Sequence, residues 1–301
     1  MREYREFTMK RIMVATDFSD VSYGALNYAK QLARCFSAKV LLVHVVDDMQ
    51  LKPGHQAVAP SLPDRLDSAE AEIQRMASGV MHDDLACSVI VRAGRIQETI
   101  LDLIHERDID LLVVGTRGKG YSNGEGLGSV AEMLLRAMPC PVLTVGRGVR
   151  QDAYENTHGR SVLFPTDFSQ TSRAALPYTE NLAHHIGARL LLLHVDENGV
   201  AANHPEGFNE LKKELRPSVV STETITRPGS AAKAILEVSN EKQVDFIAMG
   251  VHGADQAAQA HNFGVAFGVI RQAKCPVFTL FVPSPKSGKG KIDGALVVHH
   301  S

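Results

Sequence analysis

Residues 16–47 read TDFSDVSYGALNYAKQLARCFSAKVLLVHVVD, and residues 166–197 read TDFSQTSRAALPYTENLAHHIGARLLLLHVDE. The two stretches align without gaps, and 15 of their 32 positions are identical. Later landmarks recur at a smaller offset of 135, such as Gly94 with Gly229 and Pro141 with Pro276. Self-similarity over so long a period indicates two homologous domains in tandem. The second copy lacks 15 residues between its second and third expected strands.

Each copy alternates short apolar runs with amphipathic stretches. The runs of the first copy are rich in Val, Ile and Leu, as parallel strands buried on both faces are, and they span 11–16, 39–46, 87–91, 110–115 and 141–145. Helical patterns lie between these runs, near 19–36, 64–81, 96–107 and 129–138. The alternation predicts doubly wound α/β domains, which bind ligands outside the carboxyl ends of their strands. We expect domain 1 at 10–147, a linker at 148–160, domain 2 at 161–283 and a flexible tail at 284–301.

The composition excludes several classes of protein. Lys and Arg number 32 against 34 Asp and Glu, so the chain lacks the basic excess of a general nucleic-acid or membrane-surface binder. The longest apolar runs, such as 40–46, have the length of a strand and not of a membrane span. The four cysteines form no CxxC pair, which argues against a zinc site or a disulfide scaffold. We expect a cytoplasmic protein with neither nucleic acid nor membrane as a partner.

A glycine-rich segment is the strongest candidate for chemistry. Gly115-Thr-Arg-Gly118 ends a strand, and Gly128-Ser129-Val130 follows nine residues later at the start of a helix. Glycines let backbone amides approach a ligand, and a helix start offers unpaired N–H groups to a phosphate. Residues 119–127 between the anchors are rich enough in glycine for a flap. The alternative is structural: Ser129 and Glu132 form a capping-box pattern, and the glycines can serve simple turns.

Other candidates lie at the ends of the first two strands. Asp17 follows the first strand, where a carboxylate can meet a ribose or a hydrated metal, or favour the dipole of the next helix beside a Ser19 cap. His44 and His194 lie within apolar runs, which favours histidines satisfied in the core over catalytic ones.

Four segments together resemble the universal stress protein family. They are the TDFS opening, the LLxHV-type second strand, the G-x2-G-x9-GS signature and the CPVLTV strand that starts at Cys140. The resemblance covers both copies, from about residue 10 to 283. It implies a five-stranded parallel sheet of order 3-2-1-4-5 in each domain. It also implies that fifth strands pair, either between the two domains of one chain or between chains as a homodimer through sheet edges.

The resemblance further implies that domain 1 binds ATP with magnesium or manganese. Asp17 would lie near the ribose and reach the metal indirectly, through water or phosphate. The backbone of Val45 would contact adenine, Gly115 and Gly118 would hold the ribose and phosphates, and Gly128, Ser129 and Val130 would hold the terminal phosphates. Thr16 belongs to the same motif and joins this set, and Arg117 and Lys119 are further candidates for phosphate contact.

Copy two departs from the signature. It reads Gly250-Val-His-Gly253, then ten residues, then Gly264-Val265, so the spacing has grown by one and the serine is absent. We therefore expect one nucleotide site in each chain, with copy two serving structure or partner binding.

Three functions remain open from the sequence. The first is a cytosolic stress-response module whose ATP occupancy regulates a protein partner that the sequence does not name. The second is an ATPase. Its hydrolysis would be slow, because phosphoryl transfer needs more than one positioned group and no second acid accompanies Asp17. The third is a scaffold that acts without nucleotide.

Overall fold

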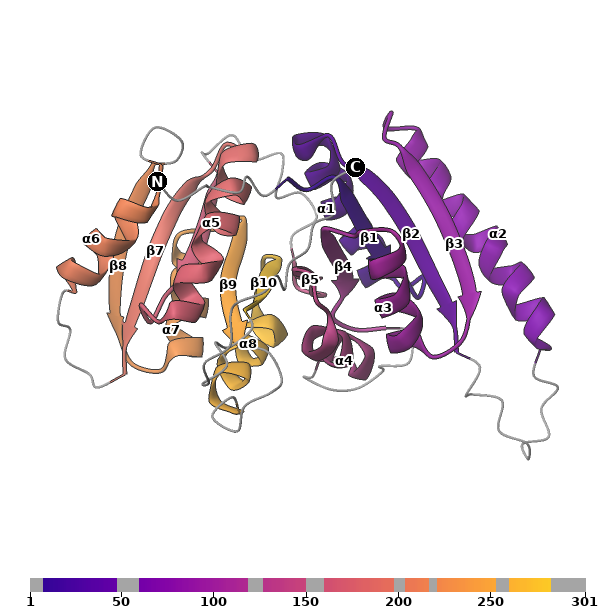
Figure 1. Cartoon of the computed structure of the whole chain (residues 1–301). Helices are drawn as coiled ribbons and strands as arrows, with labels where there is room; N and C mark the ends of the chain where they lie inside the picture. The colour runs from indigo at the N-terminus through magenta and orange to yellow at the C-terminus, as the bar shows by residue number, and fades with distance from the viewer. Residues whose placement is uncertain are drawn as a thin grey trace, which may run out of the picture.

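The computed structural model describes residues 8–47, 60–118, 127–149, 160–197, 204–216, 221–252 and 260–282. Within these ranges the chain forms two α/β domains that lie side by side (Figure 1). Most of the expected linker at 148–160 and of the expected flap at 119–127, including Lys119, lies outside the described residues, as do Gly253 and the expected tail at 284–301.

The apolar runs of the first copy form the strands of domain 1. Each strand lies within two residues of its predicted bounds: β1 (Arg11–Ala15), β2 (Lys39–Val46), β3 (Cys87–Ala93), β4 (Leu111–Gly115) and β5 (Val142–Val145). The amphipathic stretches form the helices between them, namely α1 (Asp20–Phe36), α2 (Leu62–Met81), α3 (Ile96–Glu106) and α4 (Ser129–Ala137).

Domain 2 repeats this order of elements. Its strands are β6 (Ser161–Pro165), β7 (Arg189–Asp196), β8 (Thr222–Pro228), β9 (Phe246–His252) and β10 (Val277–Val282). Its helices are α5 (Gln170–His185), α6 (Pro205–Glu214), α7 (Ala231–Glu241) and α8 (Ala260–Gln272). The residues missing from copy two shorten one element above all, because α6 has 10 residues where α2 has 20.

All ten strands belong to one sheet, in the order β3-β2-β1-β4-β5-β10-β9-β6-β7-β8. Each half has the predicted order 3-2-1-4-5, and all neighbours within a half are parallel. The halves join where β5 pairs antiparallel with β10, with Leu143 opposite Phe278. Of the two arrangements left open by the sequence, the fifth strands therefore pair within one chain.

Helices cover both faces of the sheet, and each face has one core that continues through both domains. Alternate strand residues such as Val14 and Leu42 pack under α1, α2, α5 and α6 on one face. The residues between them, such as Met13 and Val43, pack under α3, α4, α7 and α8 on the other. Buried apolar surface on both faces is the main stabilising contribution to such a fold.

Aromatic contacts cross the junction between the domains on both faces. On the α1 face, the Tyr28 ring meets the Phe246 ring edge-on at 5.9 Å, and the Phe36 ring stacks on the His185 ring at 4.2 Å. On the opposite face, the Arg136 guanidinium lies 4.7 Å from the centre of the Phe267 ring and joins α4 to α8. The two domains are thus packed against each other as well as paired through the sheet.

Candidate functional site

The turn after β1 is held by short polar contacts. The Thr16 side chain is buried, its hydroxyl lies 2.9 Å from the Ser22 hydroxyl, and it accepts a hydrogen bond from the Phe18 amide at 3.0 Å. Thr16, which the sequence placed among the nucleotide-binding residues, therefore has its hydroxyl engaged inside the protein. Its contribution in this structure is to shape the turn.

Asp17 stands at the centre of that turn and is half-buried. Its Oδ1 accepts hydrogen bonds from the Ser19 amide at 3.1 Å and from the Ser19 hydroxyl at 2.6 Å. Ser19 is also the N-cap of α1, as expected, because its hydroxyl accepts from the Ser22 amide at 3.3 Å. The carboxylate is thus anchored on one oxygen, and its other oxygen, Oδ2, lies toward Gly118.

The two glycines after β4 allow close contact. A Cβ at Gly118 would collide with Oδ2 of Asp17. A Cβ at Gly115 would lie 3.1 Å from Cγ1 of Val21, so this glycine lets β4 pack against α1. The sequence had explained both glycines by close approach of backbone amides to a ligand or by simple turns, and neither is among the described glycines with positive φ. Their role in the described structure is to leave room for a neighbour.

For the start of α4 the sequence allowed two structures, a helix start open to phosphate or a capping box formed by Ser129 and Glu132. The structure excludes the capping box. Gly128 is the N-cap, with φ −62°, and Ser129 is the first helical residue, so the capping box of Ser129 and Glu132 is wrong. The cause is a tertiary contact: the Gly128 amide donates to the Thr116 carbonyl oxygen at 2.8 Å, which fixes where the helix begins. Glu132 pairs instead with Arg136, at 2.9 Å.

Among the described residues, the first turn of α4 consequently has no side-chain cap. Ser129 and Val130 are exposed there, and the amides of a first helical turn have no partner within the helix. The partial positive charge of the helix start is directed to the same place. An anion that approached this turn would meet N–H donors and favourable charge.

Three segments of domain 1 therefore converge at the carboxyl edge of the sheet. Asp17 abuts Gly118, and Gly128 is bonded to Thr116, so the ends of β1 and β4 meet the start of α4. β1 lies between β2 and β4, which is where the strand order reverses. Ligands of doubly wound folds bind at such a point. Arg117, half-buried, lies in the same loop between Thr116 and Gly118.

The backbone of Val45 borders this edge from β2. The Val43 carbonyl accepts from the Thr16 amide at 2.9 Å, on the side of β2 that faces β1. Orientation repeats every second residue along a strand, so the Val45 backbone faces the same side. It lies beyond the last pair of the β1–β2 ladder, Ala15 with Val43. The Val45 side chain is buried in the core beneath α3 and α4.

Copy two repeats the turn but not the helix start. The Ser169 amide donates to Asp167 at 3.0 Å. Burial works to raise the pKa of Asp167, but hydrogen bonds from Ser169 and Ser172 outweigh it and hold that pKa below its usual value. α8, however, begins at Ala260, so Gly264 and Val265 lie inside the helix. The residues that align with the phosphate anchor of copy one are therefore not at a helix start.

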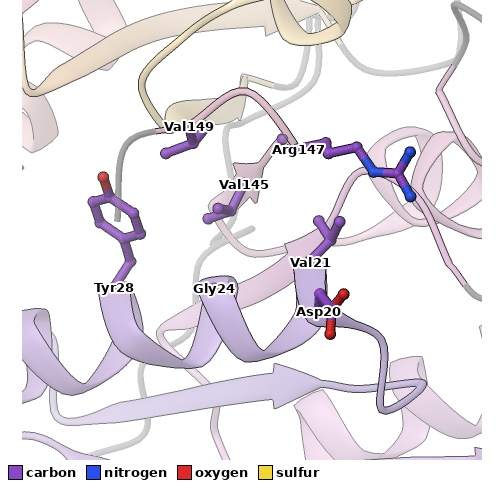
Figure 2. A pocket seen from close by; sticks show the side chains of 8 residues that line it. Asp20, Val21, Gly24, Tyr28, Val145, Arg147 and Val149 are labelled. Carbon is purple, nitrogen blue, oxygen red and sulfur yellow. The ribbon is translucent and has the colours of Figure 1, made fainter. Parts of the chain in front are cut away.

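A small hollow, which the sequence did not suggest, lies beside α1 (Figure 2). Its volume is about 120 Å³, and it lies between the first turns of α1 and the loop after β5. Its lining residues are Asp20, Val21, Gly24, Tyr28, Val145, Gly146, Arg147 and Val149. None of them belongs to the edge formed by Asp17, Gly118 and Gly128.

The described residues form neither a cluster of metal-ligating side chains nor a membrane-spanning helix. No group of three or more His, Cys, Asp or Glu side chains within those ranges is arranged to hold a metal ion. In the same part of the chain, no helix combines the length and the apolar character needed to cross a membrane. The four cysteines, all in described segments, form no disulfide.

Comparison with known proteins identifies both halves of the chain. The model of the universal stress protein family matches residues 8–146 and again residues 159–280. A universal stress protein of Thermus aquaticus is 34% identical over 138 residues, which are 45% of this chain and 98% of that protein. The universal stress protein Slr1230 of Synechocystis is 22% identical over 299 residues and covers 90% of this chain and 99% of its own.

A solved structure shares the tandem fold over most of its length. It is a universal stress protein of Archaeoglobus fulgidus, with a TM-score of 0.73 and 21% identity. The match covers 91% of this chain and 99% of that one. At 21% identity, this similarity shows that the two proteins share a fold.

Proposed function

Since this chain belongs to the universal stress protein family, we propose that it is a cytoplasmic stress-response module whose first domain binds ATP. The observation that carries the proposal is the convergence of Asp17, Gly118 and the uncapped start of α4 at one edge of the sheet. A carboxylate, a close-approach glycine and a free helix start are the groups that a nucleotide with a bound metal needs.

The parts of ATP map onto this edge as follows. The Ser129 and Val130 amides and the Ser129 hydroxyl bind the terminal phosphates, and the backbone at Gly115 and Gly118 holds the ribose and the remaining phosphates. The Val45 backbone takes the adenine edge. Arg117 supplies positive charge to the phosphates. Magnesium or manganese would bind mainly through phosphate oxygens, and Asp17 would reach it through water.

Domain 2 contributes no second nucleotide site in this proposal. Its aligned residues, Gly264 and Val265, lie within α8, where helical hydrogen bonds occupy the backbone amides. Its surface is then available to a protein partner, and the Arg136–Phe267 contact links α8 to the helix that binds phosphate. ATP bound to domain 1 would affect the partner only if this junction has two states and ATP binds one of them more tightly than the other.

The test compares two glycine variants. Gly118→Ala places a Cβ against the Asp17 carboxylate, whereas a Cβ at Gly148 meets nothing within 4 Å, so Gly148→Ala is the matched control. Nucleotide released from the denatured protein is quantified first, and Mg-ATP binding is then measured by calorimetry. We expect one ATP per wild-type chain, the same in Gly148→Ala, and at least a tenfold weaker Kd in Gly118→Ala. Two equal sites per chain, or equal affinity in Gly118→Ala, would contradict the proposal.

A further inference from the structure

Both copies hold an aromatic residue in an unfavourable backbone conformation directly after the aspartate. Phe18 and Phe168 each have φ 61°, in the left-handed region that bulky residues avoid. A conformation of this kind persists only where neighbouring groups impose it, and such positions gather at functional sites. The neighbours that impose it therefore bear on how the aspartate is placed.

A histidine on the adjacent strand is the neighbour that acts on both sides of the aspartate. The Nδ1 of His44 donates to the Thr16 carbonyl oxygen at 2.7 Å, and the His44 ring stacks on the Phe18 ring at 4.4 Å with an interplanar angle of 28°. In copy two, His194 bonds Thr166 at 2.9 Å and stacks on Phe168 at 4.5 Å and 28°. The Nδ1 of each histidine is bonded, as expected of a satisfied ring, but both side chains are half-buried and not fully in the core.

These contacts bracket Asp17. One holds the residue before it and the other holds the residue after it, so the backbone at position 17 is tied to β2. The carboxylate that this backbone carries is bonded to Ser19 through Oδ1 and lies against Gly118 through Oδ2. A turn that relaxed around Phe18 would carry the carboxylate away from Gly118.

We propose that His44 is a positioning residue for the nucleotide site: acting through Thr16 and Phe18, it holds the Asp17 carboxylate where bound nucleotide and metal need it. The inference rests on the proposed function of domain 1. It assigns a role to a half-buried side chain of the LLxHV-type strand that the sequence had not placed in the site.

The internal repeat supplies the control. His194 makes the same two contacts, but α8 starts at Ala260 and leaves no helix start at the aligned glycine. His44→Phe keeps a stacking ring and removes the Nδ1 donor. His44→Asn keeps a donor near the Nδ1 position and removes the ring. His194→Phe repeats the first change in the domain without a proposed site.

The experiment measures the Kd for Mg-ATP by calorimetry and the unfolding free energy by urea for all three variants. We expect His44→Phe to raise Kd at least tenfold and His194→Phe to leave it within twofold, although the two lose similar stability. His44→Asn should have a Kd between those of the wild type and His44→Phe. If His44→Phe does not fold, the Kd of His44→Asn is compared with that of the wild type instead. Equal Kd in His44→Phe and wild type, or an equal rise in His194→Phe, would overturn the inference.

A double-mutant cycle separates positioning from general loosening of the domain. If His44 acts through Asp17, adding His44→Phe to Asp17→Ala should change Kd by less than twofold. Full additivity of the two changes would overturn the inference and leave ATP binding intact. A wild-type protein that binds no ATP would instead overturn the proposed function and the inference with it.

Discussion

Thr144 on β5 donates its hydroxyl to the carbonyl oxygen of Val277 on β10, at a distance of 3.2 Å. Thr279 donates in the opposite direction to Val142, at 3.1 Å. The two threonines are 135 residues apart, the offset of the repeat, so the bonds are a pair related by the approximate twofold symmetry of the domains. Both side chains are buried at the domain junction. The junction is therefore stabilised by matched polar contacts in addition to the strand ladder.

Removing either hydroxyl should weaken the junction. Thr144→Val and Thr279→Val each lose one buried hydrogen bond, which typically lowers the free energy of unfolding by about 1 kcal/mol. Urea unfolding followed by circular dichroism measures the change. Thr179→Val is the comparison, because Thr179 bonds the Ala175 carbonyl at 3.0 Å within α5 and does not cross the junction. Junction variants as stable as the wild type would show that these bonds do not stabilise the paired domains.

Domain 1 on its own should associate. In the full chain the outer edge of β5 is covered by β10, and Leu143 faces Phe278 across the pair. A fragment of residues 8–147 would expose that edge with its unpaired N–H and C=O groups, and such an edge pairs readily with another chain. Light scattering coupled to gel filtration should give twice the fragment mass, while the full chain shows no contact through this edge. A folded fragment that stays monomeric at every concentration would contradict the prediction.

Much of the fold could be predicted from the sequence because the two copies constrain each other. Continuous Val, Ile and Leu runs place the buried parallel strands, and the repeat of TDFS and His44 places the same turn twice. The partner of the fifth strand could not be predicted, since β5 presents the same apolar pattern to β10 or to a second chain. That choice depends on how the linker lets the domains meet, which is a property of three-dimensional geometry.

The sequence predicted which residues form the candidate site, but it did not predict the role of each of them. Asp17, Gly118 and Gly128 do converge. Helix α4 starts at Ser129 as predicted, but its N-cap is Gly128 and not Ser129, because the Thr116 carbonyl bonds the Gly128 amide, a long-range contact that overrides the local capping pattern. Gly115 is explained by packing against Val21. The role of His44 was not anticipated, since its contacts join β2 to the turn after β1, between residues far apart in the sequence.

Replacing two further glycines by alanine should change the free energy of unfolding in opposite directions. Gly79 lies inside α2, and a Cβ there meets nothing within 4 Å, so Gly79→Ala should raise the free energy of unfolding by about 0.5–1 kcal/mol. Gly94 has φ 148°, and a Cβ there would lie 2.9 Å from Oγ1 of Thr99. Gly94→Ala should therefore lower the free energy of unfolding by more than 1 kcal/mol. Urea titrations measure the free energy of unfolding of both variants. A change of the same sign in both would contradict the prediction.

The thiols should differ in reactivity according to their burial. Burial raises the pKa of Cys87 to about 11 and that of Cys140 to about 12. Burial also raises the pKa of Cys35, but the positive charges of Arg160 and Arg34 oppose the shift. Only the thiolate reacts with iodoacetamide, so at pH 8 Cys87 should be alkylated on the order of a hundredfold more slowly than an ordinary thiol of pKa ~8.5.

Peptide mapping by mass spectrometry at several pH values measures these rates for each cysteine. Between pH 8 and pH 10 the rate at Cys87 should rise about tenfold per pH unit, because the thiolate fraction grows tenfold per unit below the pKa. An ordinary thiol reaches its plateau in the same interval, which a free cysteine peptide in the same tube would report. Cys35 should react before Cys87, and Cys140 last. A plateau at Cys87 by pH 9 would mean that its thiol meets more water than the packing of β3 against α2 allows.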